Sequence, residues 1–437
     1  EAEVPGLLLN VGFAEYGSDQ TFQDAIKEAF ENASRNKHRG VSRKGLVSLG
    51  VTRECATTAG EPASKYVEDG DSGRVWLSRA AATKREEAEK STKQKEEEYL
   101  SFFIDQENTR RAYEDWALPL ELDNMGQRIG ESHIAVVHID GNGIGKLFQE
   151  HATSAEDLRS FVKQVESRFR QAITDALEKL VRCRVLFDED KFSLVKVPDE
   201  RRFYLPFRPI VYGGDDITFV CDGRLGLPMA AKILRLLYDD TQKGNAPILS
   251  ASAGVAIVRT KFPFYRAYEL SLELCQNAKN VARQEQEVSR KFWLGFQLIP
   301  SGVTGSIKEL REWETGTGLK LHYRPWRIGD VDLSCRTLNR EWTHFEGILQ
   351  LLRNKREEEP CKEKWSRSRV KRLGTAFADG KEAVNLLVAE AEHRGCLFYE
   401  PKPNFLNRVW YGENESPYYD VIEAFDYFVE LEGNNAS

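Results

Sequence analysis

Apolar residues between positions 131 and 300 recur with the periods of strands and helices in turn. The apolar run from Ile134 to Ile139, interrupted by His138, predicts a buried strand that ends at Asp140. After Ser154, apolar residues repeat every three or four positions, which predicts a long amphipathic helix. The same reasoning predicts a hairpin over 203–220, a helix over 227–240, a strand over 248–258, a helix over 265–283 and a strand over 292–299. The order β-α-β-β-α-β, followed by a helix and a strand, predicts an α+β protein with a ferredoxin-like palm plus an extra helix and strand.

The pattern changes on both sides of this region, so we expect three parts: residues 1–130, 131–300 and 301–437. The first is an N-terminal α/β segment that we interpret as the end of a truncated first palm plus a linker. The last part has helical spacing, with Ser416-Pro417 as a helix start, and is expected to form a mostly helical C-terminal domain. The chain begins with Glu1 rather than Met, which leaves open a segment upstream.

Composition narrows the class of protein. The chain has 437 residues, of which 41% are hydrophobic and 30% charged, so it is expected to be globular rather than disordered. Its net charge of −7 argues against a general nucleic-acid coat. The seven cysteines include no Cys-x-x-Cys pair, which favours a reducing, cytoplasmic setting. No apolar stretch approaches the roughly 20 residues needed to span a bilayer, so no membrane partner is expected.

The tetrad Gly213-Gly214-Asp215-Asp216 is the strongest chemical signal in the chain. It lies between two apolar runs, so it is predicted at the turn of a hairpin. Glycine tolerates the positive φ of a tight turn and lets a phosphate approach the backbone. Adjacent carboxylates are the usual ligands of magnesium bound to a nucleotide. The pattern therefore predicts metal-assisted phosphoryl or nucleotidyl transfer.

A further carboxylate, Asp140, ends the first predicted strand of the palm. In a ferredoxin-like sheet this strand lies beside the central hairpin, so Asp140 is expected to face Asp215 and Asp216. Carboxylates on adjacent strand ends can hold two divalent ions about 3.5–4 Å apart. The carbonyl of Ile139 is a candidate additional ligand. We expect Mg²⁺ or Mn²⁺ as cofactor, with two ions bound.

The segment from His138 to Asn280 resembles the polymerase/cyclase palm of two protein families. These are the large polymerase-like subunit of type III CRISPR effector complexes and, more distantly, the GGDEF diguanylate cyclases. A Gly-Gly-Asp-Asp tetrad, rather than Gly-Gly-Asp-Glu-Phe, favours the CRISPR branch. The matching stretches are His138 to Lys146, Gly213 to Asp216, Ser252 to Ala256 and Ala278 to Asn280. Tyr323-Arg324-Pro325-Trp326 also resembles a stretch that flanks the palm in the CRISPR branch.

The resemblance implies a role for individual residues. Asp140, Asp215 and Asp216 would be the catalytic metal ligands. Lys279 would contact the triphosphate, with Arg283 one helical turn further on. The nucleotide would lie against the glycine-rich stretches, that is, Gly141, Asn142, Gly143, Gly213 and Gly214.

The resemblance also implies an activity and partners. Such enzymes convert ATP into cyclic oligoadenylates in antiviral defence. The implied partners are nucleoside triphosphates, guide or target RNA and other subunits of a CRISPR complex. The sequence departs from the family in three ways: it has no His-Asp nuclease dyad, no cysteine-rich zinc site and only one Gly-Gly-Asp-Asp palm.

Three alternatives remain open at this stage. The tetrad could be an ordinary acidic turn. The palm could be a catalytically silent scaffold in an RNA-guided defence complex, or a stand-alone cyclic dinucleotide synthase. The basic stretch from Arg35 to Lys44 is expected to be a solvated loop, and Lys362 to Arg372 a solvated segment. RNA contact is the alternative for both, and Trp365 in the second could stack on a base.

Overall fold

The computed structural model describes most of the chain, and two compact units can be distinguished in it. The units are residues 1–103 with 145–161, and residues 104–144 with 162–437. The described residues are 11–17, 20–41, 51–58, 61–69, 73–89, 115–119, 121–125, 132–151, 153–182, 194–287, 291–299, 305–314, 319–330, 340–354, 363–399, 405–407, 409–411 and 414–431.

The first unit combines a helix with a small hairpin. Helix α1 begins after Thr21, whose hydroxyl accepts a hydrogen bond from the Asp24 amide at 3.2 Å. Cys55, Leu77 and Ala82 form a small core beside the hairpin. The elements are α1 (Phe22–Val41), β1 (Lys65–Asp69), β2 (Gly73–Leu77), α2 (Arg79–Glu89), α5 (Ile144–His151) and the start of α6 (Ala155–Arg182).

The basic stretch that we expected as a loop from Arg35 is helical as far as Val41, where α1 ends. Residues 42–44 lie outside the described residues. Arginine and lysine favour helices, and Arg35 forms an ion pair with Glu31 at 3.5 Å, one turn before it. The expectation of a loop was therefore wrong for residues 35–41.

A six-stranded sheet forms the centre of the second unit, in the order β10-β9-β8-β4-β7-β6. Strand β4 pairs antiparallel with both β7 and β8, whereas β8 and β9 run parallel. Ile134 to Val137 and Ile139 are completely buried, which explains the apolar residues in this run. The strands are β4 (His133–Gly141), β6 (Phe207–Gly213), β7 (Asp216–Asp222), β8 (Ala251–Arg259), β9 (Trp293–Leu298) and β10 (Trp326–Arg327). Two short strands, β3 (Trp116–Ala117) and β5 (Phe203–Tyr204), pair separately.

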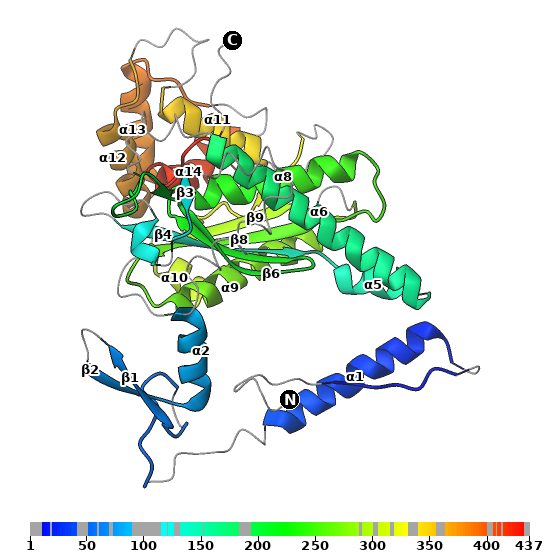
Figure 1. The fold of residues 1–437 in the computed structure, drawn as a ribbon. Helices are drawn as coiled ribbons and strands as arrows, with labels where there is room; N and C mark the ends of the chain where they lie inside the picture. Colours follow the sequence, from blue (N-terminus) through cyan, green and yellow to red (C-terminus); the bar gives the residue numbers. More distant parts are fainter. Residues whose placement is uncertain are drawn as a thin grey trace. The chain divides into compact units, whose positions relative to one another are not determined.

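Helices α9 (Phe264–Ala282) and α8 (Gly226–Gln242) cover opposite faces of this sheet (Figure 1). Helix α9 comes very close to β8, because a Cβ atom at Gly254 would collide with the backbone of Ser271 and Cys275. Gly295, the register partner of Gly254 on β9, also faces α9, with the Leu274 carbonyl 3.0 Å from where its Cβ would be. Two paired glycines therefore set the distance between α9 and the sheet.

The C-terminal part of this unit is rich in helix. Helix α14 begins at the expected Ser416-Pro417, where the Ser416 hydroxyl accepts a hydrogen bond from the Tyr418 amide at 3.3 Å. The elements here are α10 (Ile307–Glu314), α11 (Trp342–Leu352), α12 (Arg367–Asp379), α13 (Lys381–His393), β11 (Phe405–Asn407), β12 (Trp410–Tyr411) and α14 (Pro417–Ala424). A mixed α+β architecture is therefore confirmed. Within the described residues, every helix is too short or too polar to cross a membrane.

A buried charge network joins α14 to the segment before β10. Asp420 of α14 is fully buried and accepts hydrogen bonds from the Arg324 amide at 2.7 Å and the Trp326 indole at 2.9 Å. The guanidinium of Arg324 forms ion pairs with Asp420 and Glu423. Burial alone would raise the pKa of Asp420, but the positive charge of Arg324 and hydrogen bonds from His322 and Trp326 hold it below the usual value. The Tyr323-Arg324-Pro325-Trp326 stretch thus has a structural role.

We predict that Gly254→Ala destabilises the protein. The added methyl group must displace the α9 backbone, and overpacking of this kind costs about 1–3 kcal/mol or more. Thermal unfolding followed by circular dichroism would measure the loss. The matched control is Gly213→Ala, because a Cβ atom there meets nothing within 4 Å. Equal melting temperatures for the two variants would contradict the close approach of α9.

We also predict that Asp420→Asn lowers stability at pH 7 by about 3 kcal/mol, because it removes one partner of a buried ion pair. The folded-state pKa of Asp420 is lowered, so its contribution is present above the unfolded value of about 4 and is lost as the pH falls further. The difference from the parent protein should therefore narrow in urea titrations at pH 3. Asp379→Asn, at an exposed helix end, is the control. A difference that is the same at both pH values would argue against an ionised Asp420.

Candidate active site

The predicted hairpin is present, and its turn is two residues long. Gly213 ends β6 and pairs with Asp216, the first residue of β7, so that Gly214 and Asp215 form the turn. Gly214 has a φ of 64°, which agrees with glycine at the first position of a type II′ turn. Asp215 therefore lies in the turn itself, and Asp216 already belongs to the strand.

Strand register brings Asp140 and Asp216 together. The two residues are direct partners across the β4–β7 pair, where opposite Cβ atoms lie about 4.5–5.5 Å apart. Asp215 comes close to the next residue of β4, since a Cβ atom at Gly141 would lie 2.7 Å from Asp215 Oδ2 and 3.0 Å from Asp215 Cβ. Only a residue without a side chain fits beneath Asp215. The predicted convergence of the three carboxylates at one end of the sheet is observed.

The three carboxylates repel one another. Burial, followed by the negative charge of Asp140, raises the pKa of Asp215. The same two causes, in the same order, raise the pKa of Asp216. The positive charge of Lys279 opposes both shifts. A site of this kind gains from any further cation.

Lys279 contacts the acidic group through Asp140. Its ammonium forms an ion pair with Asp140 Oδ2 and donates a hydrogen bond to the Gly141 carbonyl at 2.8 Å. The side chain is 15% exposed. Lys279 reaches the site from α9, whose distance from the sheet depends on Gly254. Sequence reasoning placed Lys279 near the site but did not foresee its contact with Asp140.

A polar layer lies directly below the acidic group. His138 Nδ1 is hydrogen-bonded to the Thr218 hydroxyl at 3.0 Å and lies 3.4 Å from Asp216 Oδ1. Burial lowers the pKa of His138, which favours the neutral ring. Asp216 Oδ1 is itself buried, and no described residue gives it a hydrogen bond. A buried carboxylate oxygen without a donor is suited to a cation, so the donor set fits divalent metal ions.

The side chain of Asn142 holds the loop that follows Asp140. Asn142 accepts a hydrogen bond from the Ser252 hydroxyl at 2.9 Å and donates one to the Lys291 carbonyl. Both ends of the amide are thus engaged within the protein. Gly143 is exposed with a φ of 68°. Sequence reasoning did not single out Ser252 for this role, although it lies in one of the stretches that carry the resemblance.

Two other predicted site residues, Arg283 and Ile139, lie outside the group formed by the three carboxylates and Lys279. Arg283 lies just after α9, is exposed and bonds Asn280 at 3.2 Å. Among the described residues, its side-chain hydrogen bond goes to Asn280 and not to any of the three carboxylates. Ile139 is buried in β4 between Ile217 and Ala253. Its carbonyl as a ligand, like the roles of the other site residues, stays a prediction.

A second cluster of metal-ligand residues occurs away from the sheet end. The ligand atoms of His322, Asp420 and Glu423 all lie within 4.8 Å of one another. The guanidinium of Arg324 contacts each of these three side chains. Since Arg324 already supplies the positive charge, we interpret this cluster as part of the network that holds α14.

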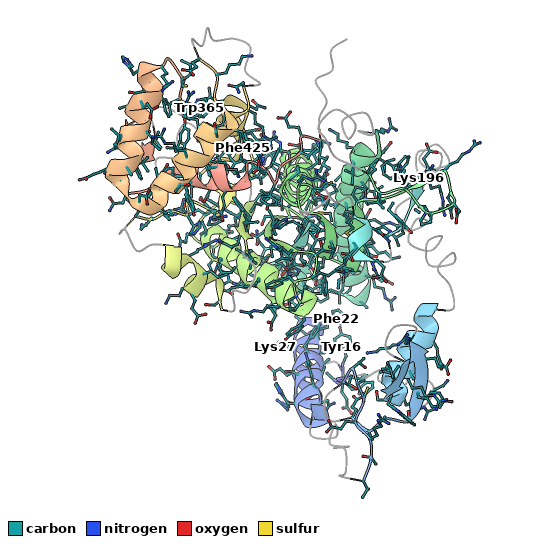
Figure 2. The ribbon with its side chains drawn as sticks, turned by 90° about the vertical axis from the view of Figure 1, so that its left-hand side faces the viewer. Tyr16, Phe22, Lys27, Lys196, Trp365 and Phe425 are labelled. Atoms are coloured by element: carbon teal, nitrogen blue, oxygen red, sulfur yellow. The ribbon has the colours of Figure 1, made fainter. Side chains whose placement is uncertain are left out.

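The alternative role of Trp365 is not supported. Trp365, labelled in Figure 2, is only 5% exposed and packs edge-to-face against Phe398. Its indole donates a hydrogen bond to the Leu397 carbonyl at 2.8 Å. Stacking of Trp365 on an RNA base was therefore a wrong alternative, because the ring belongs to the core.

Residues 133–287 match the family model of Cas10/Cmr2, second palm domain. No curated protein matches the chain. Among solved structures, a Csm1–Csm4 cassette in complex with AMPPNP aligns at 14% identity and a TM-score of 0.37, over 95% of this chain and 54% of that chain. The complex with pppApApA aligns at 14% identity and a TM-score of 0.36, over 95% of this chain and 53% of that chain. The complex with cA3 aligns at 19% identity and a TM-score of 0.27, over 35% of this chain and 20% of that chain.

The chain thus spans between 20% and 54% of the length of these three structures. At such TM-scores the likeness to them carries no conclusion about function. The family match is different, because it covers β4, β6, β7, β8 and α9, the elements that carry the acidic group and Lys279. It confirms the resemblance inferred from the sequence: residues 133–287 are a palm similar to that of the polymerase-like subunit of type III CRISPR effector complexes.

Proposed function

We propose that this chain is a metal-dependent nucleotidyltransferase that converts ATP into cyclic oligoadenylates in CRISPR-type antiviral signalling. The observation that carries the proposal is the convergence of Asp140, Asp215 and Asp216 with one lysine at the end of a sheet. Clustered like charges destabilise a fold and are usually kept for a function. The match to the Cas10/Cmr2 second palm domain supports the same reading.

In this proposal Asp140, Asp215 and Asp216, with the Ile139 carbonyl, hold two Mg²⁺ or Mn²⁺ ions. Bound ions of this kind activate a ribose hydroxyl and stabilise the negative charge of a triphosphate leaving group. Gly213 and Gly214 leave the backbone open to the nucleotide, and Lys279 and Arg283 supply positive charge for its phosphates. Asn142 acts by fixing the loop of Gly141 and Gly143.

The finer architecture is part of the proposal. We interpret the strand order β8-β4-β7-β6 as a ferredoxin-like core with β9 added. The division of the sequence at residues 130 and 300, with a mostly helical C-terminal part, is retained as a proposal in which that part also supplies β10 to the palm sheet. So are the partners, namely nucleoside triphosphates, guide or target RNA and other CRISPR subunits, and the cytoplasmic location.

We predict that Asp215→Asn combined with Asp216→Asn abolishes nucleotide turnover. Loss of residues that only orient metal ligands typically costs 10–100-fold, so loss of the ligands should cost more than about a hundredfold. The measurement is mass spectrometry of products formed from each of the four nucleoside triphosphates with Mg²⁺ or Mn²⁺. The variant should melt no lower than the parent, because it removes two repelling charges. Asp379→Asn is the control, and turnover retained by the folded double variant would exclude the site.

We predict separate effects for two glycines of the site. Gly141→Ala should weaken Mn²⁺ binding, measured by titration calorimetry, because its methyl group collides with Ile144 and with the Asp215 carboxylate. Gly213→Ala should leave Mn²⁺ binding unchanged, since the space around it is open. It should weaken ATP binding if the nucleotide lies against this glycine. Unchanged ATP affinity in Gly213→Ala would remove Gly213 from the nucleotide site.

A further inference from the structure

The contacts of Lys279 are those of a bound cation. Its ammonium is held by one carboxylate oxygen, from Asp140, and by one main-chain carbonyl oxygen, from Gly141. Carboxylate and carbonyl oxygens are also the ligands that hard divalent ions prefer. Lys279 therefore uses oxygens at the very place where the proposed metal ligands converge.

We propose that Lys279 competes with the divalent ion for this place, and that a triphosphate relieves the competition by drawing the lysine away. The inference rests on the proposed function. It makes Lys279 a specificity-determining residue that couples metal binding to the presence of a triphosphate. This role goes beyond a simple contact between lysine and phosphate.

Electrostatic repulsion should make the lysine lower the affinity of the site for a metal ion. A lysine ammonium and a divalent ion that share Asp140 repel each other. Unit charges about 4 Å apart interact appreciably even at a high effective dielectric constant. Asp140 must also divide its charge between the two cations. Metal affinity without nucleotide should therefore be lower with Lys279 than without it.

The structure indicates which part of Lys279 can move. Helix α9 is held against the sheet by the close approach at Gly254, so the lysine backbone is fixed. The side chain has four methylene groups and three rotatable donors, and it can exchange one set of oxygens for another. A triphosphate offers several anionic oxygens, whereas a nucleoside offers none. Release of Asp140 should therefore depend on the phosphates and not on the base.

Linkage makes the effect reciprocal. If triphosphate binding frees Asp140 for the metal, then metal binding must favour the triphosphate by the same factor. A lysine that touched only the phosphates would add to ATP affinity but would leave metal affinity unchanged. The two descriptions therefore differ in a measurement made without nucleotide.

The test is Mn²⁺ binding by the full chain in the absence of nucleotide, followed by electron paramagnetic resonance or calorimetry. Lys279→Met should bind Mn²⁺ at least about tenfold more tightly than the parent. Lys279→Arg keeps the charge and should stay close to the parent. Lys261→Met, at the opposite end of β8 and 84% exposed, is the matched control and should be unchanged. Mn²⁺ should also raise the melting temperature of Lys279→Met more than that of the parent, which checks that the variant is folded.

A second measurement repeats the titrations with ATP and with adenosine. ATP should increase Mn²⁺ affinity by a larger factor in the parent than in Lys279→Met, and adenosine should have no effect in either. If folded Lys279→Met binds Mn²⁺ no better than the parent, the competition is wrong while the proposed metal site stands. If neither protein binds Mn²⁺ with or without ATP, both the competition and the proposed function are wrong.

Discussion

The second unit depends on the register of β4 between β7 and β8. This register is set by the apolar residues of β4, which are buried on both faces of the sheet and tolerate no slip. Its consequence at the strand end is unfavourable, because it places Asp140 directly opposite Asp216 and next to Asp215. The hydrophobic core thus holds together carboxylates that would separate if they were free. Burial, and after it the charge of Asp140, raises the pKa values of Asp215 and Asp216.

Helix α9 supplies the positive charge of Lys279 that opposes the carboxylates. The position of this helix is set by its packing against the sheet. The paired glycines Gly254 and Gly295 let the helix lie closer to the sheet than any side chain would permit. This closeness brings the Lys279 ammonium to Asp140 and Gly141. Two features that seem unrelated in the sequence, a glycine in a strand and a lysine in a helix, therefore serve one site.

Features that depend on neighbouring residues could be predicted from the sequence. Features that depend on contacts between distant parts of the chain could not. The first strand of the palm, expected to end at Asp140 and observed to end at Gly141, and the Gly214 turn follow from local patterns. The topology then brings the acids together. Asn142 bonds the carbonyl of Lys291, 149 positions later, which no local pattern indicates. The helical character of Arg35 to Val41 was missed because the run of charge was given more weight than the helix propensity of arginine and lysine. Burial of Trp365 was missed because its neighbours in the sequence are charged, whereas in the fold its ring packs against Phe398.

The attachment of α14 to the edge of the sheet limits how the palm can be isolated. Strand β10, which pairs with β9, lies beyond residue 300 and is followed along the chain by the helices that lead to Asp420 and Glu423. A fragment cut at residue 300 would lose the edge strand and expose the apolar side of β9. A fragment cut after β10 would keep a buried arginine whose acidic partners are gone. The smallest autonomous folding piece that contains the acidic site should therefore extend through α14.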